Sequence, residues 1–156
     1  IPVFVGLLVV VVGGLIGTTS VQAQASDEPF VITITEERAQ QAVDIRTYRR
    51  DRFDNMRVDM QPGQVVLSGT VNPWFGTSFD GTLTLVPGVE NGRVVWNATA
   101  GTINGATASA SEIDRLNREI GASLRRYAKQ TLDPGRVIGV EVTADALFIS
   151  YARASR

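Results

Sequence analysis

The side chains that carry most enzyme chemistry are scarce in this 156-residue chain. It has no histidine and no cysteine, which excludes the commonest general base, thiolate nucleophiles and cysteine-based zinc sites. No Gly-x-Ser-x-Gly sequence marks a nucleophile elbow, and the single lysine, Lys129, is followed by Gln130 where a P-loop has Ser or Thr. We therefore expect a protein that is not an enzyme and that uses neither a cofactor nor a metal ion.

Two carboxylates stand in an otherwise almost uncharged stretch, residues 61–111. Asp80 and Glu90 share this stretch with one basic residue, Arg93. A pair of carboxylates can perform acid–base catalysis when both reach the same substrate. Both residues flank predicted turns, however, where acidic side chains are common because they form local hydrogen bonds. We favour this structural interpretation.

Basic residues cluster near position 50. Arg46, Arg49 and Arg50 could face lipid phosphates, because guanidinium groups match phosphate oxygens in geometry and charge. Aspartates such as Asp44 and Asp51 are interspersed with them, so we favour a solvated helix end in which Arg and Asp pair with each other. The net charge of −1 gives no indication of nucleic-acid binding.

Trp74 and Phe75 are the most unusual neighbours in the chain, since they lie in a predicted loop between Pro73 and Gly76. Two large aromatic side chains in such a loop can enter a bilayer interface or contact a partner protein. They can equally fold back onto the core of their own domain. The sequence leaves both interpretations open.

The elements that would position these residues begin with a β-branched strand at residues 30–35. Thr35 is the expected N-cap of a first helix, with Glu36 and Glu37 in its first turn, where the helix dipole favours acids. This helix is expected to extend to about Arg49. Its apolar positions are sparse.

A strand-rich block follows, and apolar residues alternate with polar ones in it. Strands are expected at residues 56–60, 65–71, 82–85 and 94–99, and a further strand at about 101–108. Turns are expected at residues 61–64, where Pro62 and Gly63 suit a type II turn, and at 90–93, where Asn91 and Gly92 suit positive φ. The alternation predicts a sheet with one buried face and one wet face.

The second helix is the clearest element. Ser111 is its expected N-cap, with Asp114 three residues later. One apolar face is spaced at helical intervals and consists of Ile113, Leu116, Ile120, Leu124 and Tyr127. We expect this face to cover the sheet, although an amphipathic helix on a membrane surface has the same pattern. Strands at residues 137–142 and 146–151 close the domain, and the short turns predict an antiparallel sheet in the α+β class.

The first 19 residues are the longest apolar stretch, and the first charged residue is Asp27. A bilayer core about 30 Å thick needs roughly 20 helical residues, so residues 1–19 suffice for a transmembrane anchor. The sequence Ala23-Gln24-Ala25 also fits a signal-peptidase site, which would make the segment a leader cleaved after Ala25. We favour a retained anchor, a linker at residues 20–29 and a folded domain at residues 30–156.

The residues that flank this segment suggest its orientation. Asp27 and Glu28 follow it without a basic residue nearby, and basic flanks are the ones that stay in the cytoplasm. The domain is therefore expected to be periplasmic or extracellular. Gly6, Gly13 and Gly17 share one face of the expected helix, and the GxxxG spacing of the last two would let a second membrane helix approach closely.

Several segments together resemble the bacterial LmeA-like phospholipid-binding proteins. The resemblance covers about residues 30–153 and is carried by residues 32–37, 58–71, 89–94, 113–117, 140–142 and 147–150. It implies a curved antiparallel sheet packed on one long amphipathic helix with a second, shorter helix, and a secreted or membrane-anchored protein that binds phospholipid. It assigns no site residue.

The expected function is thus a non-catalytic, single-pass, membrane-anchored domain of lipid-binding type, with the membrane and a phospholipid as partners. The alternative is an accessory subunit, which its transmembrane helix would hold in a larger assembly of membrane proteins.

Overall fold

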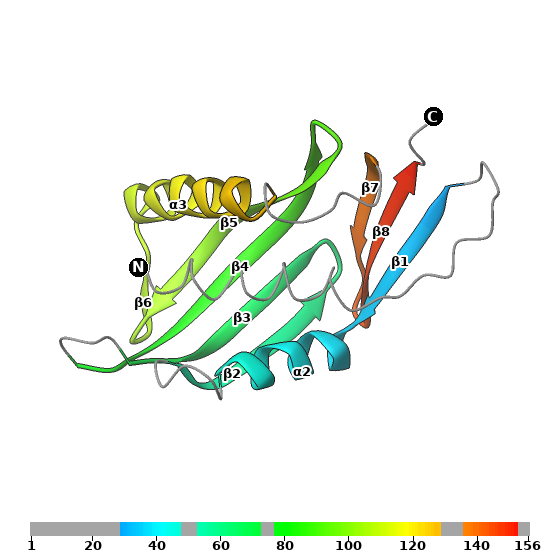
Figure 1. Cartoon of the computed structure of the whole chain (residues 1–156). Helices are drawn as coiled ribbons and strands as arrows, with labels where there is room; N and C mark the ends of the chain where they lie inside the picture. Colours follow the sequence, from blue (N-terminus) through cyan, green and yellow to red (C-terminus); the bar gives the residue numbers. More distant parts are fainter. Residues whose placement is uncertain (1–28, 48–52, 73–76, 129–135, 153–156) are drawn as a thin grey trace.

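The computed structural model describes residues 29–47, 53–72, 77–128 and 136–152, which form an α+β domain (Figure 1). Along the chain its elements are β1 (Phe30–Thr35), α2 (Glu36–Thr47), β2 (Phe53–Gln61), β3 (Gln64–Val71), β4 (Phe79–Glu90), β5 (Arg93–Ile103), β6 (Ala106–Thr107), α3 (Ala110–Ala128), β7 (Arg136–Val142) and β8 (Ala146–Ala152). The fold class predicted from the sequence is confirmed.

The described strands form two antiparallel sheets, so the prediction of a single sheet was wrong. The larger has the order β2-β3-β4-β5-β6 and the smaller the order β1-β8-β7. β7 passes the two hairpin tips of the larger sheet: the Gly63 N–H donates to the Val142 carbonyl and the Val137 N–H donates to the Gly92 carbonyl, each at 2.8 Å. Alternation predicts a strand but not its neighbours, and so these tip contacts could not be foreseen.

Positive-φ residues mark the hairpin turns. Gly63 has a φ of 80° in the β2–β3 turn, and Asn91 and Gly92 have φ values of 52° and 73° in the β4–β5 turn, as predicted. Asn104 and Gly105 repeat this pattern with φ values of 48° and 80°. The strand expected at residues 101–108 is therefore two pieces, the end of β5 and the short β6, which turns back on it.

A bulge in β2 explains a glycine in β3. The pairing of β2 with β3 shifts between Asp54 and Arg57, and Asn55 there has a φ of 53°. Gly69 lies opposite this irregularity. A Cβ on Gly69 would collide with the Met56 side chain and lie 3.0 Å from the Met56 Cα, so only glycine fits without movement of the backbone.

Both helices begin at capping residues. The Arg38 N–H donates to Thr35 Oγ1 over 3.3 Å at the start of α2, which confirms Thr35 as N-cap. The cap of α3 is Ser109, so the prediction of Ser111 with Asp114 was wrong. The sequence from Ser109 to Glu112 has the S-x-x-E spacing of a capping box, in which a glutamate reaches back to the cap N–H.

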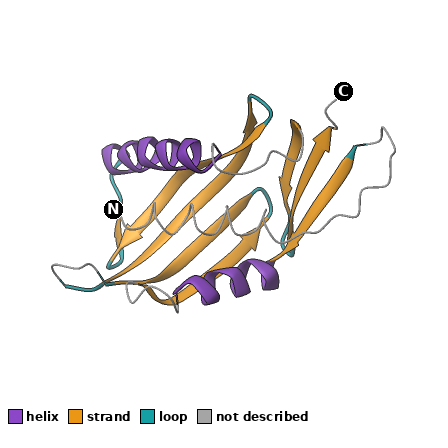
Figure 2. Cartoon of the chain, in the orientation of Figure 1, coloured by secondary structure: helices purple, strands orange, loops and turns teal. Residues whose placement is uncertain are grey.

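One apolar core joins both sheets and both helices. Residues of alternating strand positions and of one face of each helix contribute to it, including Ala39 and Val43 of α2 and Leu116 and Ile120 of α3. In the smaller sheet Phe30 stacks on Tyr151, with ring centroids 5.1 Å apart. Figure 2 shows α2 and α3 near opposite edges of the larger sheet.

Candidate functional site

The inner face of the larger sheet is apolar across four strands. Its side chains alternate with outward-facing polar residues, as expected for a sheet with one buried face. The buried residues on this face are Met56, Val58, Met60, Val65, Leu67, Val71, Leu83, Leu85, Trp96 and Ala98. The alternation in the sequence predicted each of these positions.

Helix α2 lies along the β2 edge, and amide and carboxylate groups fix it there. Gln40 Nε2 donates to the Met56 carbonyl (2.7 Å), and the Val58 N–H donates to Gln40 Oε1 (2.8 Å). One turn earlier, Glu36 Oε2 accepts from the Met60 N–H (2.7 Å). These side chains satisfy backbone groups that a further strand would otherwise pair.

Helix α3 is held against β5 by similar hydrogen bonds between a side-chain amide and the strand backbone. The Ala98 N–H donates to Asn117 Oδ1 (2.7 Å), and Asn117 Nδ2 donates to the Ala98 carbonyl (2.9 Å). The two helices are therefore fixed to the outermost long strands, and the middle strands β3 and β4 lie between them (Figure 1). The prediction that the second helix covers the sheet holds for its β5 side.

The stretch of sheet between the helices consists of the middle strands β3 and β4. β3 has eight residues, which span about 27 Å at roughly 3.4 Å per residue, and three strand spacings from β2 to β5 give about 14 Å. Leu67 and Leu85 at its centre are each 1% exposed. A ligand bound on this face would replace protein atoms that now cover it.

Trp96 is the one residue of this face that carries a polar atom in its side chain. The indole is 6% exposed, and its Nε1–H has no hydrogen-bond acceptor in the part of the chain that the structure describes. A buried donor without a partner costs about 1–3 kcal/mol. The alternation in residues 94–98 predicts Trp96 only as an apolar strand position, although the N–H donor of a Trp side chain is a signal that it needs a polar partner.

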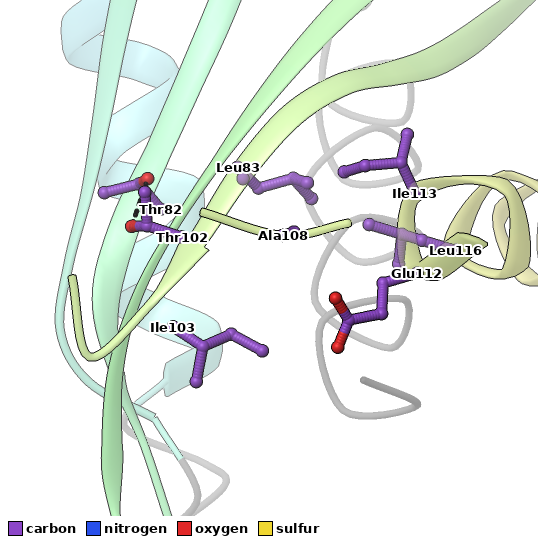
Figure 3. Close-up of a pocket in the computed structure, with 9 residues that line it drawn as sticks. Thr82, Leu83, Thr102, Ile103, Ala108, Glu112, Ile113 and Leu116 are labelled. Atoms are coloured by element: carbon purple, nitrogen blue, oxygen red, sulfur yellow. Dashed lines mark hydrogen bonds between the residues drawn. The ribbon is translucent and has the colours of Figure 1, made fainter. Parts of the chain in front are cut away.

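A small cavity lies between α3 and strands β4 and β5. Leu83, Ile103, Ile113 and Leu116 line it (Figure 3), and its volume is about 30 Å³. This is room for only a few water molecules. An acyl chain does not fit there, so a lipid would need the wider face between the two helices.

Glu112 lies at the rim of this cavity and belongs to the cap of α3 (Figure 3). The Ser109 hydroxyl donates to Glu112 Oε2 over 2.7 Å, and the Ser109 N–H donates to the same oxygen over 2.8 Å. These two donors, the hydroxyl first, hold the pKa of Glu112 below its ordinary value of 4.5. The charge of Glu112 thus has a structural role at the helix N-terminus.

The two carboxylates considered for catalysis lie at opposite ends of β4. Ten residues of strand separate them by about 34 Å, so Asp80 and Glu90 do not form a catalytic pair. Asp80 instead accepts from the Thr70 hydroxyl over 2.6 Å. No group of three or more acidic side chains within the described ranges could hold a metal ion.

The other predicted site residues are only partly placed. Leu116 and Ile120 are buried and Ile113 is half-buried, which confirms their place on the apolar face of α3. Leu124 and Tyr127 belong to the same helix, but their side chains are outside the description, as is that of Arg46 in α2. The residues that lie wholly outside the described ranges are Gly6, Gly13, Gly17, Arg49, Arg50, Trp74 and Phe75.

The predicted anchor at residues 1–19 also falls outside the described ranges. Neither helix in the described part of the chain has the length and apolar character needed to cross a bilayer. Comparisons with protein-family models, characterised proteins and solved structures find no match to this chain. The resemblance to LmeA-like proteins therefore stays a prediction.

Proposed function

We propose that this chain is a non-catalytic, membrane-anchored domain of lipid-binding type, located outside the cytoplasm. The observation that supports this most is the position of the helices. Gln40 and Asn117 fix α2 and α3 to the edges of the larger sheet, so a wide apolar face on β3 and β4 lies between them. Apolar ligands bind surfaces of this kind, because burial of apolar area drives the association.

Residues 1–19 would hold the domain next to the membrane from which it takes up lipid. A segment of this length and composition spans a bilayer as a helix. The linker at residues 20–29 is then short, and the domain stays close to the headgroups. Binding would transfer acyl chains from the bilayer onto the face between α2 and α3.

Photo-crosslinking tests the proposal on the full chain. A phosphatidylcholine with a photoactivatable acyl chain is incorporated into vesicles that hold the protein, and labelled peptides are identified by mass spectrometry. We expect labels on β3 and β4 as well as on residues 1–19. Labels confined to residues 1–19 would show that the domain takes up no lipid.

A matched pair of variants locates the site. Leu67→Trp fills the inner face, whereas Ser68→Trp places the same bulk on the opposite face of β3. We expect Leu67→Trp to reduce labelling of the domain about tenfold and Ser68→Trp to leave it unchanged. Labelling of residues 1–19 serves as the internal control, and circular dichroism checks that both variants fold.

A second candidate function is that of an accessory subunit in a membrane assembly. It is favoured by two exposed apolar residues on the smaller sheet, Val31 (55% exposed) and Ile138 (52% exposed), which would suit a protein contact. In that case Gly13→Leu with Gly17→Leu would release the protein from its assembly in native electrophoresis while it stays in the membrane. Unchanged co-migration would count against it.

A further inference from the structure

Protein atoms cover the inner face of the larger sheet, and one segment of this chain is suited to supply them. We propose that residues 1–19 lie on this face, between α2 and α3, whenever they are outside a bilayer. The segment and a lipid then compete for the same apolar surface. This inference goes beyond the proposed function, because it assigns a protein occupant to the face whether or not the face takes up lipid.

The first step is the burial of the middle of the sheet. Leu67 of β3 and Leu85 of β4 are each 1% exposed, so protein atoms cover both side chains. Among the described elements, however, the helices pack mainly on the outer long strands, α2 on β2 and α3 on β5. Gln40 and Asn117 hold them there through hydrogen bonds to the strand backbones. The centre of the face therefore needs a further segment to cover it.

The second step is the choice of that segment. Charged residues occur in most stretches outside the described ranges, namely residues 20–28, 48–52, 129–135 and 153–156. Residues 73–76 are too short to span the face. Residues 1–19 have no charge along their whole length. A helix that is apolar on all sides is buried either in a bilayer or in a protein interior, so outside a bilayer this segment requires an apolar surface of the protein.

The third step is the match in size. Residues 1–19 as a helix are about 28 Å long, at roughly 1.5 Å per residue. The eight residues of β3 span about 27 Å. One helix is about 10 Å across, and it fits on the roughly 14 Å of sheet from β2 to β5. The segment therefore covers the middle strands along their full length.

The fourth step is the reach of the linker. Phe30 of β1 pairs with Tyr151 of β8, and Tyr151 pairs with Val137 of β7. The Val137 N–H donates to the Gly92 carbonyl at the tip of the β4–β5 hairpin. Three strand spacings of about 4.8 Å thus place Phe30 roughly 15 Å from that tip. Residues 20–29 can extend over about 33 Å, so they allow the segment to reach the face.

Pairs of engineered cysteines test the contact in the full chain, which has no cysteine of its own. One cysteine is placed at each of residues 8–11 in turn, since four consecutive positions sample every side of a helix. The other is introduced as Leu67→Cys on the inner face or, as the matched control, as Ser68→Cys on the opposite face of β3. The chain is synthesised without lipid or detergent and oxidised, and non-reducing electrophoresis detects intramolecular disulfides.

We expect at least one pair with Leu67→Cys to cross-link about tenfold more than its Ser68→Cys counterpart, because a disulfide needs neighbouring Cβ atoms. In phosphatidylcholine vesicles the same pair should lose most of its cross-link, since residues 1–19 then enter the bilayer. Equal cross-linking of the two series would overturn the contact. A cross-link of dimer mass would also overturn it, because the segment would then lie on another copy. A cross-link that persists in vesicles would overturn the competition with lipid.

The unmodified chain provides a measurement that does not depend on the folding of the cysteine variants. With residues 1–19 on the face, it should elute as a monomer in size-exclusion chromatography without detergent. Aggregation that detergent reverses would contradict the proposal, because it would show that the apolar segment is exposed. Photo-labelling of the domain by lipid is measured separately, so a failure of this contact is distinguishable from a failure of the proposed function.

Discussion

The side-chain amides of Gln40 and Asn117 each form the two hydrogen bonds that a neighbouring strand would otherwise form. In both cases an amide side chain pairs with the backbone of an outer long strand, β2 or β5, through its oxygen and its nitrogen together. Open strand edges invite pairing with other chains. The two amides therefore protect the sheet and also determine where the helices lie, which in turn leaves β3 and β4 between them.

Replacement of Gln40 by Leu should destabilise the domain by about 1–3 kcal/mol, because the Met56 carbonyl and the Val58 N–H lose their partner. Gln41→Leu is the matched control. Its side chain is on the exposed side of α2 and donates to Glu37 over 3.3 Å, so its effect should stay within about 0.5 kcal/mol. Urea denaturation measures both. Equal effects of the two substitutions would argue against the edge role of Gln40.

The cap of α3 predicts a pH dependence. A carboxyl whose pKa falls on folding stabilises the folded state above its unfolded pKa and ceases to do so as the pH falls through its folded pKa. The pKa of Glu112 is lowered from 4.5 by Ser109. Wild type should therefore have a higher Tm than Glu112→Ala at pH 7, and the difference should shrink as the pH falls below about 4.5. A difference that is the same at pH 3 as at pH 7 would contradict this.

Helix α3 packs on the sheet through buried residues that include Leu116 and Ile120. Ile120 is fully buried between the helix and the sheet. Ile120→Ala should cost about 2–5 kcal/mol, through lost burial and the cavity that remains. Arg118→Ala, on the exposed side of the same helix, is the control and should change stability by less than about 0.5 kcal/mol. If the two variants unfold at the same denaturant concentration, Ile120 is not a core residue.

The positions of the helices and strands along the chain were more predictable from the sequence than the contacts between them. The apolar residues at positions 56, 58 and 60 predicted both a strand and its buried face, because side chains in a strand alternate with a period of two. No such pattern in the sequence predicts the hydrogen bonds between Gly63 and Val142 or between Ala98 and Asn117, since these bonds join distant parts of the chain. Ser109 was missed as a cap because Ser111, two residues later, also precedes an acid at the right spacing.

The candidate site was predictable only in its apolar part. Alternation placed Leu67 and Leu85 on one face, and a helical interval placed Leu116 and Ile120 opposite the sheet. The unpaired donor of Trp96 could not be foreseen, because whether a buried indole finds an acceptor depends on every neighbour in three dimensions. The same holds for the separation of Asp80 and Glu90, which required knowledge that one strand contains both.

The whole chain combines an apolar segment at residues 1–19 with a domain whose larger sheet has one apolar face. In the arrangement that we propose, the segment would supply the membrane location and the domain would bind a lipid. The two parts make separate predictions, because a domain can fold and bind lipid whether or not its anchor contacts other helices.

Native mass spectrometry of the full chain, released from membranes in a mild detergent, tests lipid binding most directly. We predict a main species heavier than the protein by one diacyl phospholipid, which persists at collision energies that remove detergent. Leu67→Trp should shift the population to the lipid-free mass, whereas Ser68→Trp should not. A wild-type protein that appears only at its own mass would contradict the account.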